Sequence, residues 1–207
     1  MKKSLVALCG VAVSLTLMAS TSFGAVGFFG TGGGFTILNL NGAGNVFYSS
    51  DGSLDTGLNP ALPGADLGTF NLFTDTLVLD GGESQTFKND NAPNPPNDVT
   101  GGDLNYSVAA SGGSHSFSAI NLPFSANLPN PGDQRWQETG QAINLLAGLT
   151  PGNYELQVFH RGTSNGGDFF LNNGGNNYTA TFTVTPEPSR ALFLLFGLAG
   201  VVLRRRR

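Results

Sequence analysis

The sequence predicts an all-β protein, an antiparallel β-sandwich, and three observations lead to that prediction. The central part of the chain contains no amphipathic helical stretch of convincing length. Apolar and polar residues alternate there in short segments that are separated by Gly, Asn, Pro and Asp. Sixteen Phe and only 12% charged residues are consistent with two sheets around one core. We expect a jelly roll, with an immunoglobulin-like arrangement as the alternative, between an N-terminal signal helix and a C-terminal hydrophobic helix.

Residues 1–24 have the three parts of a secretory signal peptide. Lys2 and Lys3 form the charged start, an apolar run follows over Leu5–Met18, and small residues precede the expected cleavage after Gly24 or Ala25. The short run and the small residues favour this interpretation over an uncleaved anchor. We therefore expect export through the Sec translocon.

Residues 25–185 form the body, in which seven segments show the alternation expected of strands. In chain order these are GGGFTILNL (32–40), TDTLVLD (74–80), ESQTFKN (83–89), DLNYSVAA (103–110), SHSFSAIN (114–121), GNYELQVFHR (152–161) and NYTATFTV (177–184). The last segment places Tyr178, Ala180, Phe182 and Val184 on one face. The preceding one aligns the side chains of Tyr154, Leu156 and Val158, whereas the first aligns Phe35 and Ile37 but Leu40 only imperfectly.

Two loops stand out between these segments. Residues 89–98, NDNAPNPPND, form a Pro- and Asn-rich hinge that cannot continue a strand. Residues 163–177 contain two Gly-Gly turns, and we expect Phe169, Phe170 and Leu171 to be held in a loop between them. We find no internal repeat.

The charge of the body excludes some classes of partner. It carries thirteen acidic residues against three basic ones, Lys88, Arg135 and Arg161, which is a net charge of −10. No basic surface is available to neutralise phosphates, so nucleic acid and anionic lipid are not expected as partners. Cys9 is the only cysteine and lies in the signal peptide, so the body has no disulfide, no thiol nucleophile and no cysteine-ligated metal.

No pattern of catalytic residues is present, and we predict that the protein is not an enzyme. His115 and His160 lack the spacing of a zinc site, and we expect the first at the start of a strand in solvent and the second at the rim of the sandwich. No nucleophile turn of the G-x-S-x-G type occurs. The body glutamates, Glu83, Glu138 and Glu155, are expected on the solvated surface, although pairing of two carboxylates in space stays open.

We predict no cofactor, and calcium is the one metal left open. Loop oxygen ligands are supplied by Asp80, Glu83, Asn89, Asp90, Asp98 and Asp103. The sequence contains no EF-hand loop and no glycine-aspartate repeat, and turns alone require Asn, Asp and Gly.

Trp136 is the candidate contact for a glycan. It lies in GDQRWQETG, which we expect to be a polar loop, and aromatic platforms on sandwiches can stack on sugars. The alternative is a ring that caps one end of the sandwich.

The C-terminal segment, residues 186–207, combines three features. These are the motif Pro186-Glu187-Pro188, an uncharged run over Ala191–Leu203, and a cluster of arginines at Arg204, Arg205, Arg206 and Arg207. The run is about 20 Å long as a helix, which falls short of a hydrocarbon layer of roughly 30 Å. It can span a membrane only marginally, with the arginines in the cytoplasm. An ordinary single-span anchor is the alternative.

This arrangement, behind a signal peptide, resembles the PEP-CTERM sorting signal of Gram-negative bacteria. The resemblance covers residues 186–207 only. It implies recognition by an exosortase, a membrane protease, and cleavage near Pro186, Glu187 and Pro188. It also implies a precursor held briefly in the inner membrane, followed by delivery to the envelope, the cell surface or the extracellular matrix. The segment from Gly148 to Val184 also resembles the end of uncharacterised bodies that precede this tail, and that resemblance adds no activity.

Together these features predict an exported bacterial surface or matrix protein with a non-enzymatic structural or adhesive body. The alternative is a carbohydrate-binding module that acts on exopolysaccharide, and a hydrolase is the third possibility. The sequence leaves open the ligand of the body, the strand order, both cleavage positions and the oligomeric state.

Overall fold

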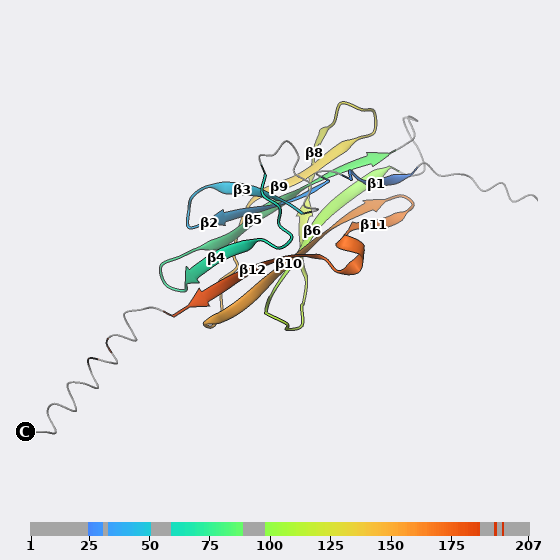
Figure 1. The fold of residues 1–207 in the computed structure, drawn as a ribbon. Coiled ribbons are helices and arrows are strands. Elements are labelled where there is room, and N and C mark those ends of the chain that lie inside the picture. The colour runs from blue at the N-terminus through green and yellow to red at the C-terminus, as the bar shows by residue number, and fades with distance from the viewer. Residues whose placement is uncertain are drawn as a thin grey trace, which may run out of the picture.

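Two β-sheets packed face to face make up the body, which confirms the predicted all-β sandwich (Figure 1). The computed structural model describes residues 25–30, 33–50, 59–88, 98–186, 193 and 196. The predicted signal helix and, apart from Phe193 and Phe196, the predicted C-terminal helix lie outside these residues. Within the described part of the chain, no helix combines the length and the hydrophobicity that crossing a membrane requires.

In the described residues each sheet contains six strands. Sheet A has the order β3-β2-β5-β9-β8, and β1 also pairs with β5. Its strands are β1 (Val26–Phe28), β2 (Gly34–Leu40), β3 (Asn45–Ser49), β5 (Leu77–Lys88), β8 (Phe124–Asn127) and β9 (Gln134–Asn144). Sheet B has the order β4-β12-β10-β6-β7, and β11 also pairs with β10. Its strands are β4 (Asp66–Asn71), β6 (Val99–Ala110), β7 (Ser118–Leu122), β10 (Gly152–Ser164), β11 (Gly167–Leu171) and β12 (Tyr178–Thr185), and a short 3₁₀ helix, η1 (Asn173–Gly175), precedes β12.

The strand order follows the immunoglobulin-like alternative and not the jelly roll. In a jelly roll the first and last strands are neighbours in one sheet, whereas here β2 lies in sheet A and β12 in sheet B. The chain instead places β2-β5-β9-β8 and β12-β10-β6-β7 as the A-B-E-D and G-F-C-C′ sheets of an immunoglobulin-like sandwich. Strands β3 and β4 are inserted between the first two of these, and β4 runs parallel to β12.

The edges of β5 and β10 each carry two shorter strands in succession. Strand β1 pairs with the end of β5 and β2 with the rest of it. In the same way β11 pairs with His160–Ser164 of β10, while β12 pairs with Gly152–Val158. The prediction that residues 163–177 are a loop is therefore wrong for 167–171, because Gly167 at φ 124° allows a tight hairpin into β11.

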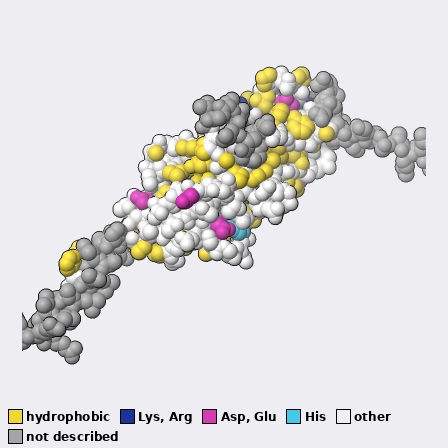
Figure 2. Space-filling model, in the orientation of Figure 1, with side chains coloured by type: hydrophobic (Ala, Val, Ile, Leu, Met, Phe, Trp, Pro, Cys, Tyr) yellow, Lys and Arg dark blue, Asp and Glu magenta, His cyan; other side chains and the backbone are white. Residues whose placement is uncertain are grey.

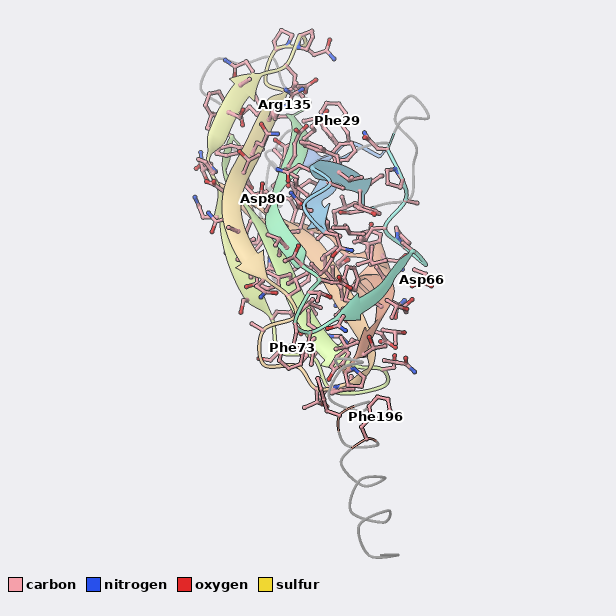
Figure 3. The ribbon with its side chains drawn as sticks, turned by 90° about the vertical axis from the view of Figure 1, so that its left-hand side faces the viewer. Phe29, Asp66, Phe73, Asp80, Arg135 and Phe196 are labelled. Carbon is pink, nitrogen blue, oxygen red and sulfur yellow. The ribbon has the colours of Figure 1, made fainter. Side chains whose placement is uncertain are left out.

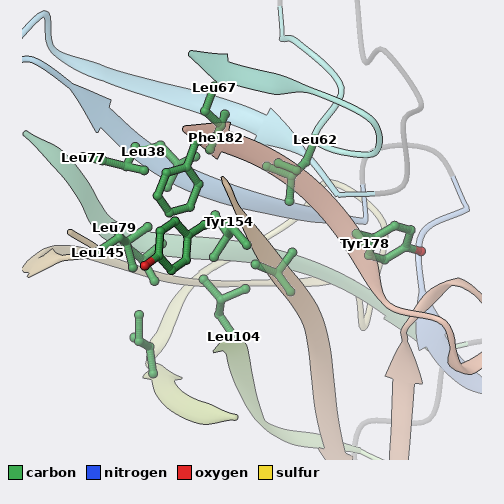
Figure 4. Packing of buried hydrophobic residues seen from close by; sticks show 14 of the residues in the cluster. Leu38, Leu62, Leu67, Leu77, Leu79, Leu104, Leu145, Tyr154, Tyr178 and Phe182 are labelled. Atoms are coloured by element: carbon green, nitrogen blue, oxygen red, sulfur yellow. The ribbon is translucent and has the colours of Figure 1, made fainter. Parts of the chain in front are cut away.

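The core lies between the sheets and is closed by aromatic and aliphatic side chains from both (Figure 4). Tyr154 of β10 stacks on Phe182 of β12, with ring centroids 5.6 Å apart. The alternation predicted for these two strands is confirmed, since Tyr154, Leu156 and Val158 are buried, as are Tyr178 and Phe182. The space-filling view shows hydrophobic side chains gathered in a band along the body and only isolated charged ones (Figure 2).

The body is elongated, and the chain enters and leaves it at opposite ends (Figure 1). Strand β1 lies at the entry end, and Phe29 and Arg135 mark that end in Figure 3. Phe73, in the turn between β4 and β5, lies at the other end, where β12 finishes (Figures 1 and 3).

Candidate recognition surface on sheet B

Trp136, the predicted glycan contact, lies in strand β9 and not in a polar loop. Its side chain is part of the core and is only 7% exposed. The indole nitrogen donates to Thr86 Oγ1 at 3.2 Å, and Phe124 packs against the ring edge to face. Neither ring face is free to stack on a sugar, so the structure favours the alternative of a structural ring.

His160 is buried between the sheets, and the prediction that it lies at the rim is wrong. Its Nδ1 atom lies 2.9 Å from Ser84 Oγ, and its Nε2 atom lies 2.9 Å from Ser50 Oγ. A serine–histidine contact is the first element of a hydrolase site. All three side chains are fully buried, however, so no substrate reaches either hydroxyl, and the group serves as an internal polar link between the sheets.

Two of the three body glutamates lie on different sheets, each on the side of its sheet that faces away from the core. Glu83 is buried, contrary to the prediction, and accepts hydrogen bonds from Gln85 and Gln137 while Arg135 Nε lies 3.3 Å away. Its neighbour in β5, Ser84, points into the core, so Glu83 lies on the outer face of sheet A. Glu155, next to the core residue Tyr154, lies on the outer face of sheet B, so these two carboxylates cannot flank one glycosidic bond.

The predicted calcium ligands are dispersed in the described residues and bonded to protein donors. Asp80 accepts from Asn45 and from the Ala142 amide, and Asp98 and Asp103 pair with Lys88 and Arg161. Asn89 and Asp90 lie outside the described part of the chain. Within that part, no three His, Cys, Asp or Glu side chains form a group that could hold a metal ion.

A line of aromatic rings crosses the outer face of sheet B, and we call Phe117, Phe159 and Phe170 the aromatic strip. Phe159 comes from the middle of β10, Phe117 from the residue before β7, and Phe170 from β11. Ring centroids are 5.1 Å apart for Phe117–Phe159 and 6.3 Å apart for Phe159–Phe170. Phe117 is 38% exposed and Phe170 is 51% exposed, so the strip presents apolar ring surface to solvent.

An ion-pair group borders the strip on one side. Arg161 lies across from Phe170 in the β10–β11 pair, and its Nε atom donates to Asp103 Oδ2 at 2.9 Å. Its Nη1 atom lies 3.7 Å from Asp168 Oδ2. The hydrogen bond to Asp103, together with the charge of that carboxylate, raises the pKa of the Arg161 guanidinium above its ordinary value. Arg161 and Asp168 each keep about two fifths of their side-chain surface exposed, so both can bind a ligand.

Amide and imidazole groups border the strip on the other side. Gln157, two residues before Phe159, accepts from Asn177 Nδ2 at 3.5 Å. His115 stacks on Phe117 with ring centroids 6.1 Å apart, and its Nδ1 atom lies 3.2 Å from Ser107 Oγ. The predicted position of His115 in solvent at the start of a strand is therefore wrong, because its side chain is only 11% exposed.

A shallow hollow lies further along the same sheet, beside β12. It has a volume of about 260 Å³ and is lined by Asp66, Ser111, Asn153, Tyr154, Thr181, Phe182 and Thr183. This is below the roughly 300 Å³ at which small-molecule pockets begin. The aromatic strip, with charged groups on one side and amides on the other, is therefore the stronger candidate site.

Of the predicted sorting motif, only Pro186 is described. It follows Thr185, the last residue of β12, and its carbonyl accepts from Asn71 Nδ2 of β4 at 3.5 Å. Glu187, Pro188 and Arg204–Arg207 lie outside the described residues.

Sequence reasoning missed the strip, although the alternation of β10 contained part of the signal. If Tyr154, Leu156 and Val158 face the core, Phe159 must face outward. The positions of Phe117 and Phe170 were not predictable in this way, because they depend on which strands pair with β10.

No protein-family model matches the chain, and no curated protein matches it. Among solved structures the chain is similar to the CooA pilin subunit from enterotoxigenic Escherichia coli, with 15% sequence identity. The match covers 73% of this chain and 99% of the pilin subunit, with a TM-score of 0.25. A similarity at this TM-score supports no conclusion about fold or function.

Proposed function

We propose that the chain is the precursor of an exported, non-enzymatic surface or extracellular-matrix protein of a Gram-negative bacterium. In this proposal the Sec translocon exports it, and residues 186–207 act as a PEP-CTERM sorting signal that an exosortase-type protease recognises. The membrane holds the precursor only until that cleavage. The β-sandwich then remains outside as an adhesive or structural body.

The position of the motif is the observation that carries the proposal. Pro186 is the first residue after the last strand, at the end of the body opposite to β1 (Figure 1). None of the described strands is lost if the chain is cut at or after Pro186. The acidic body also carries no basic surface that would keep it on an anionic membrane after release.

A non-enzymatic body agrees with the positions of its reactive side chains. The serines beside His160 are buried, and Glu83 and Glu155 lie on different sheets. On the outer face of sheet B, the carboxylates of Asp103 and Asp168 are paired with Arg161, and that of Glu155 lies beside His115.

Fractionation of producing cells tests the sorting part. We expect the intact protein to appear first in the membrane fraction and then at the surface or in the medium. A chain produced without residues 186–207 should be released without appearing in the membrane fraction. The intact mass of the recovered protein should show loss of residues 1–24 and of residues after Pro186. Full-length material in the cytosol, or the same surface form from the truncated chain, would contradict the proposal.

Turnover assays test the non-enzymatic part separately. We expect no activity of the purified protein in a broad panel of glycosidase and esterase substrates. Turnover that disappears in Glu155→Gln or Ser84→Ala, with the fold intact, would show that the body is a hydrolase.

A further inference from the structure

We propose that the aromatic strip is a binding platform for a neutral polysaccharide chain. This inference deepens the proposed function, on which it rests, because it names the partner of the exported body. It transfers the glycan contact from Trp136, which is buried, to Phe117, Phe159 and Phe170.

The strip offers a sugar chain a row of apolar rings, whose planes are inclined to one another by 66° for Phe117–Phe159 and by 52° for Phe159–Phe170. A pyranose ring has an apolar face of C–H groups, which packs on an aromatic ring and is withdrawn from water there. The three rings follow one another at centroid distances of 5.1 and 6.3 Å across strands β10 and β11 and the start of β7. They therefore offer consecutive contacts to a linear polymer and not one pocket for a single sugar.

The polar groups beside the strip match the hydroxyls of such a chain. Arg161 and Asp168 are both partly exposed, so they can donate to and accept from neighbouring hydroxyls while keeping their contact with each other. Gln157 and Asn177 offer amide groups on the opposite side. In the described part of the chain, the buried Nδ2 atom of Asn105, directly across from Phe159, has no hydrogen-bond partner.

The charges select a neutral polymer over an acidic one. The body has a net charge of −10, and of its three basic side chains only Arg161 borders the strip, where two carboxylates already neutralise it. A polyanion would meet repulsion at Asp103, Asp168 and Glu155.

A second copy of the chain fits this face less well than a polysaccharide. The centre of a protein–protein interface is depleted in charged residues. The strip lies between Arg161 with its carboxylates and the Glu155–His115 pair, and an apolar partner would have to desolvate these groups without replacing their contacts with water. Sugar hydroxyls replace those contacts.

Affinity electrophoresis of the full-length chain, in a detergent without a sugar headgroup, tests the proposal. The gels contain hydroxyethylcellulose, laminarin, dextran, galactomannan or xylan as neutral probes and alginate as the acidic one. We expect retardation by at least one neutral probe and none by alginate. Phe159→Ala and Phe170→Ala should each weaken binding about tenfold, and the double variant should abolish it.

Two control variants separate the strip from general effects. Phe73→Ala removes a ring that is 55% exposed, similar to Phe170, but that lies in the β4–β5 turn. Trp136→Phe alters the residue that the sequence predicted as the glycan contact. Both should bind as the unmodified protein does, with circular dichroism to confirm folding of every variant.

Absence of binding to all neutral probes, or equal binding by the double variant, would overturn the proposal. A dimer in light scattering that Phe170→Ala dissociates, without glycan binding, would assign the strip to self-association.

These outcomes are independent of sorting. If the protein binds a neutral polysaccharide, but a chain produced without residues 186–207 still reaches the surface, the sorting signal alone is refuted. A correctly sorted protein without glycan binding would refute the platform alone.

Discussion

Tyr154 connects the start of strand β10 to the turn that precedes it. Its hydroxyl donates to the Thr150 carbonyl at 2.7 Å and accepts from the Thr150 amide at 3.1 Å. The stretch LTPGNY thereby forms a tyrosine corner, which immunoglobulin-like sandwiches have at the same point of the chain. The residue also stacks on Phe182, so one side chain fixes both the turn and the core (Figure 4).

We expect Tyr154→Phe to lower the free energy of unfolding by about 1–2 kcal/mol, because the ring stays in the core while the hydrogen bonds between its hydroxyl and Thr150 are lost. Urea denaturation of the unmodified protein and the variant measures the difference. Tyr106→Phe, which removes a hydroxyl from the partly buried Tyr106 in β6, is the matched control and should change stability less. Equal effects of the two substitutions would show that the corner adds nothing specific.

Trp136 and His160 show where residue-level prediction failed. Trp136 was assigned to a loop because Asp, Gln, Arg, Glu and Gly surround it, yet it is a core residue of an eleven-residue strand. His160 continues the buried face of β10, which the sequence did indicate, but the prediction took it for the end of the strand. For Trp136, polar neighbours were taken as a sign of exposure, whereas in a strand they only occupy the opposite face. For His160 the error was the length of the strand, which continues to Ser164.

At the scale of elements, a bulge in β5 changes which residues of that strand face the core. The pairing of β2 with β5 shifts where Asp80 of β5 has no partner in β2, so Leu79 before the bulge and Ser84 after it both face the core. Strand β2 itself keeps its alternation, and Leu40 did not fit the face of Phe35 and Ile37 because it shares the opposite, core-facing side with Leu38. Strands β10 and β12 pair without a shift in register. Their alternation of buried and outward-facing residues is therefore unbroken, and the sequence predicted it correctly.

Gly81 makes the bulge in β5 possible. Its φ is 146°, and a Cβ atom there would lie 2.0 Å from the Glu138 carbonyl oxygen of β9. We expect Gly81→Ala to destabilise the protein by at least about 3 kcal/mol, because both the dihedral strain and the backbone clash must be relieved.

Thermal and urea unfolding of Gly81→Ala measure this effect. Gly30→Ala is the control, since among the described residues other than its chain neighbours no heavy atom lies within 4 Å of its Cβ position, and it should stay within about 0.5 kcal/mol of the unmodified protein. A Gly81→Ala protein of ordinary stability would mean that β5 and β9 can pair in another register.

At the scale of the whole molecule, the sandwich was predictable but its strand order was not. Alternation reports which face of a strand is buried, and it contains no information about which strand lies beside it. The central pairs here join β5 to β9 and β6 to β10, about 50 residues apart in sequence. The aromatic strip depends on these pairings, so it could not be assembled from the sequence alone.

The whole-molecule arrangement also bears on how the precursor would be processed. Thr185 pairs with Asn71 of β4, its carbonyl accepts from the Leu72 amide, and Asn71 holds the Pro186 carbonyl. The proposed cleavage motif thus begins without any linker, and a protease cleft that takes an extended segment would contact the folded sheet. If an exosortase-type protease acts near Pro188, the fold itself should slow the cut.

We therefore expect a six-residue Gly-Ser insertion between Thr185 and Pro186 to speed conversion of precursor to mature protein several-fold, as followed by pulse-chase labelling and immunoblotting. The same insertion after Gly112, in the turn between β6 and β7, is the control and should leave the rate unchanged, because it does not extend the segment before the motif. Asn71→Ala should act in the same direction as the first insertion but more weakly, since it removes the bonds of the Asn71 side chain to the Pro186 carbonyl and the Phe73 amide without lengthening the segment before the motif. Equal half-times for all three variants and the unmodified chain would mean that the protease reaches its site without displacing the end of β12, and that cleavage lies further towards the C-terminus than the motif suggests.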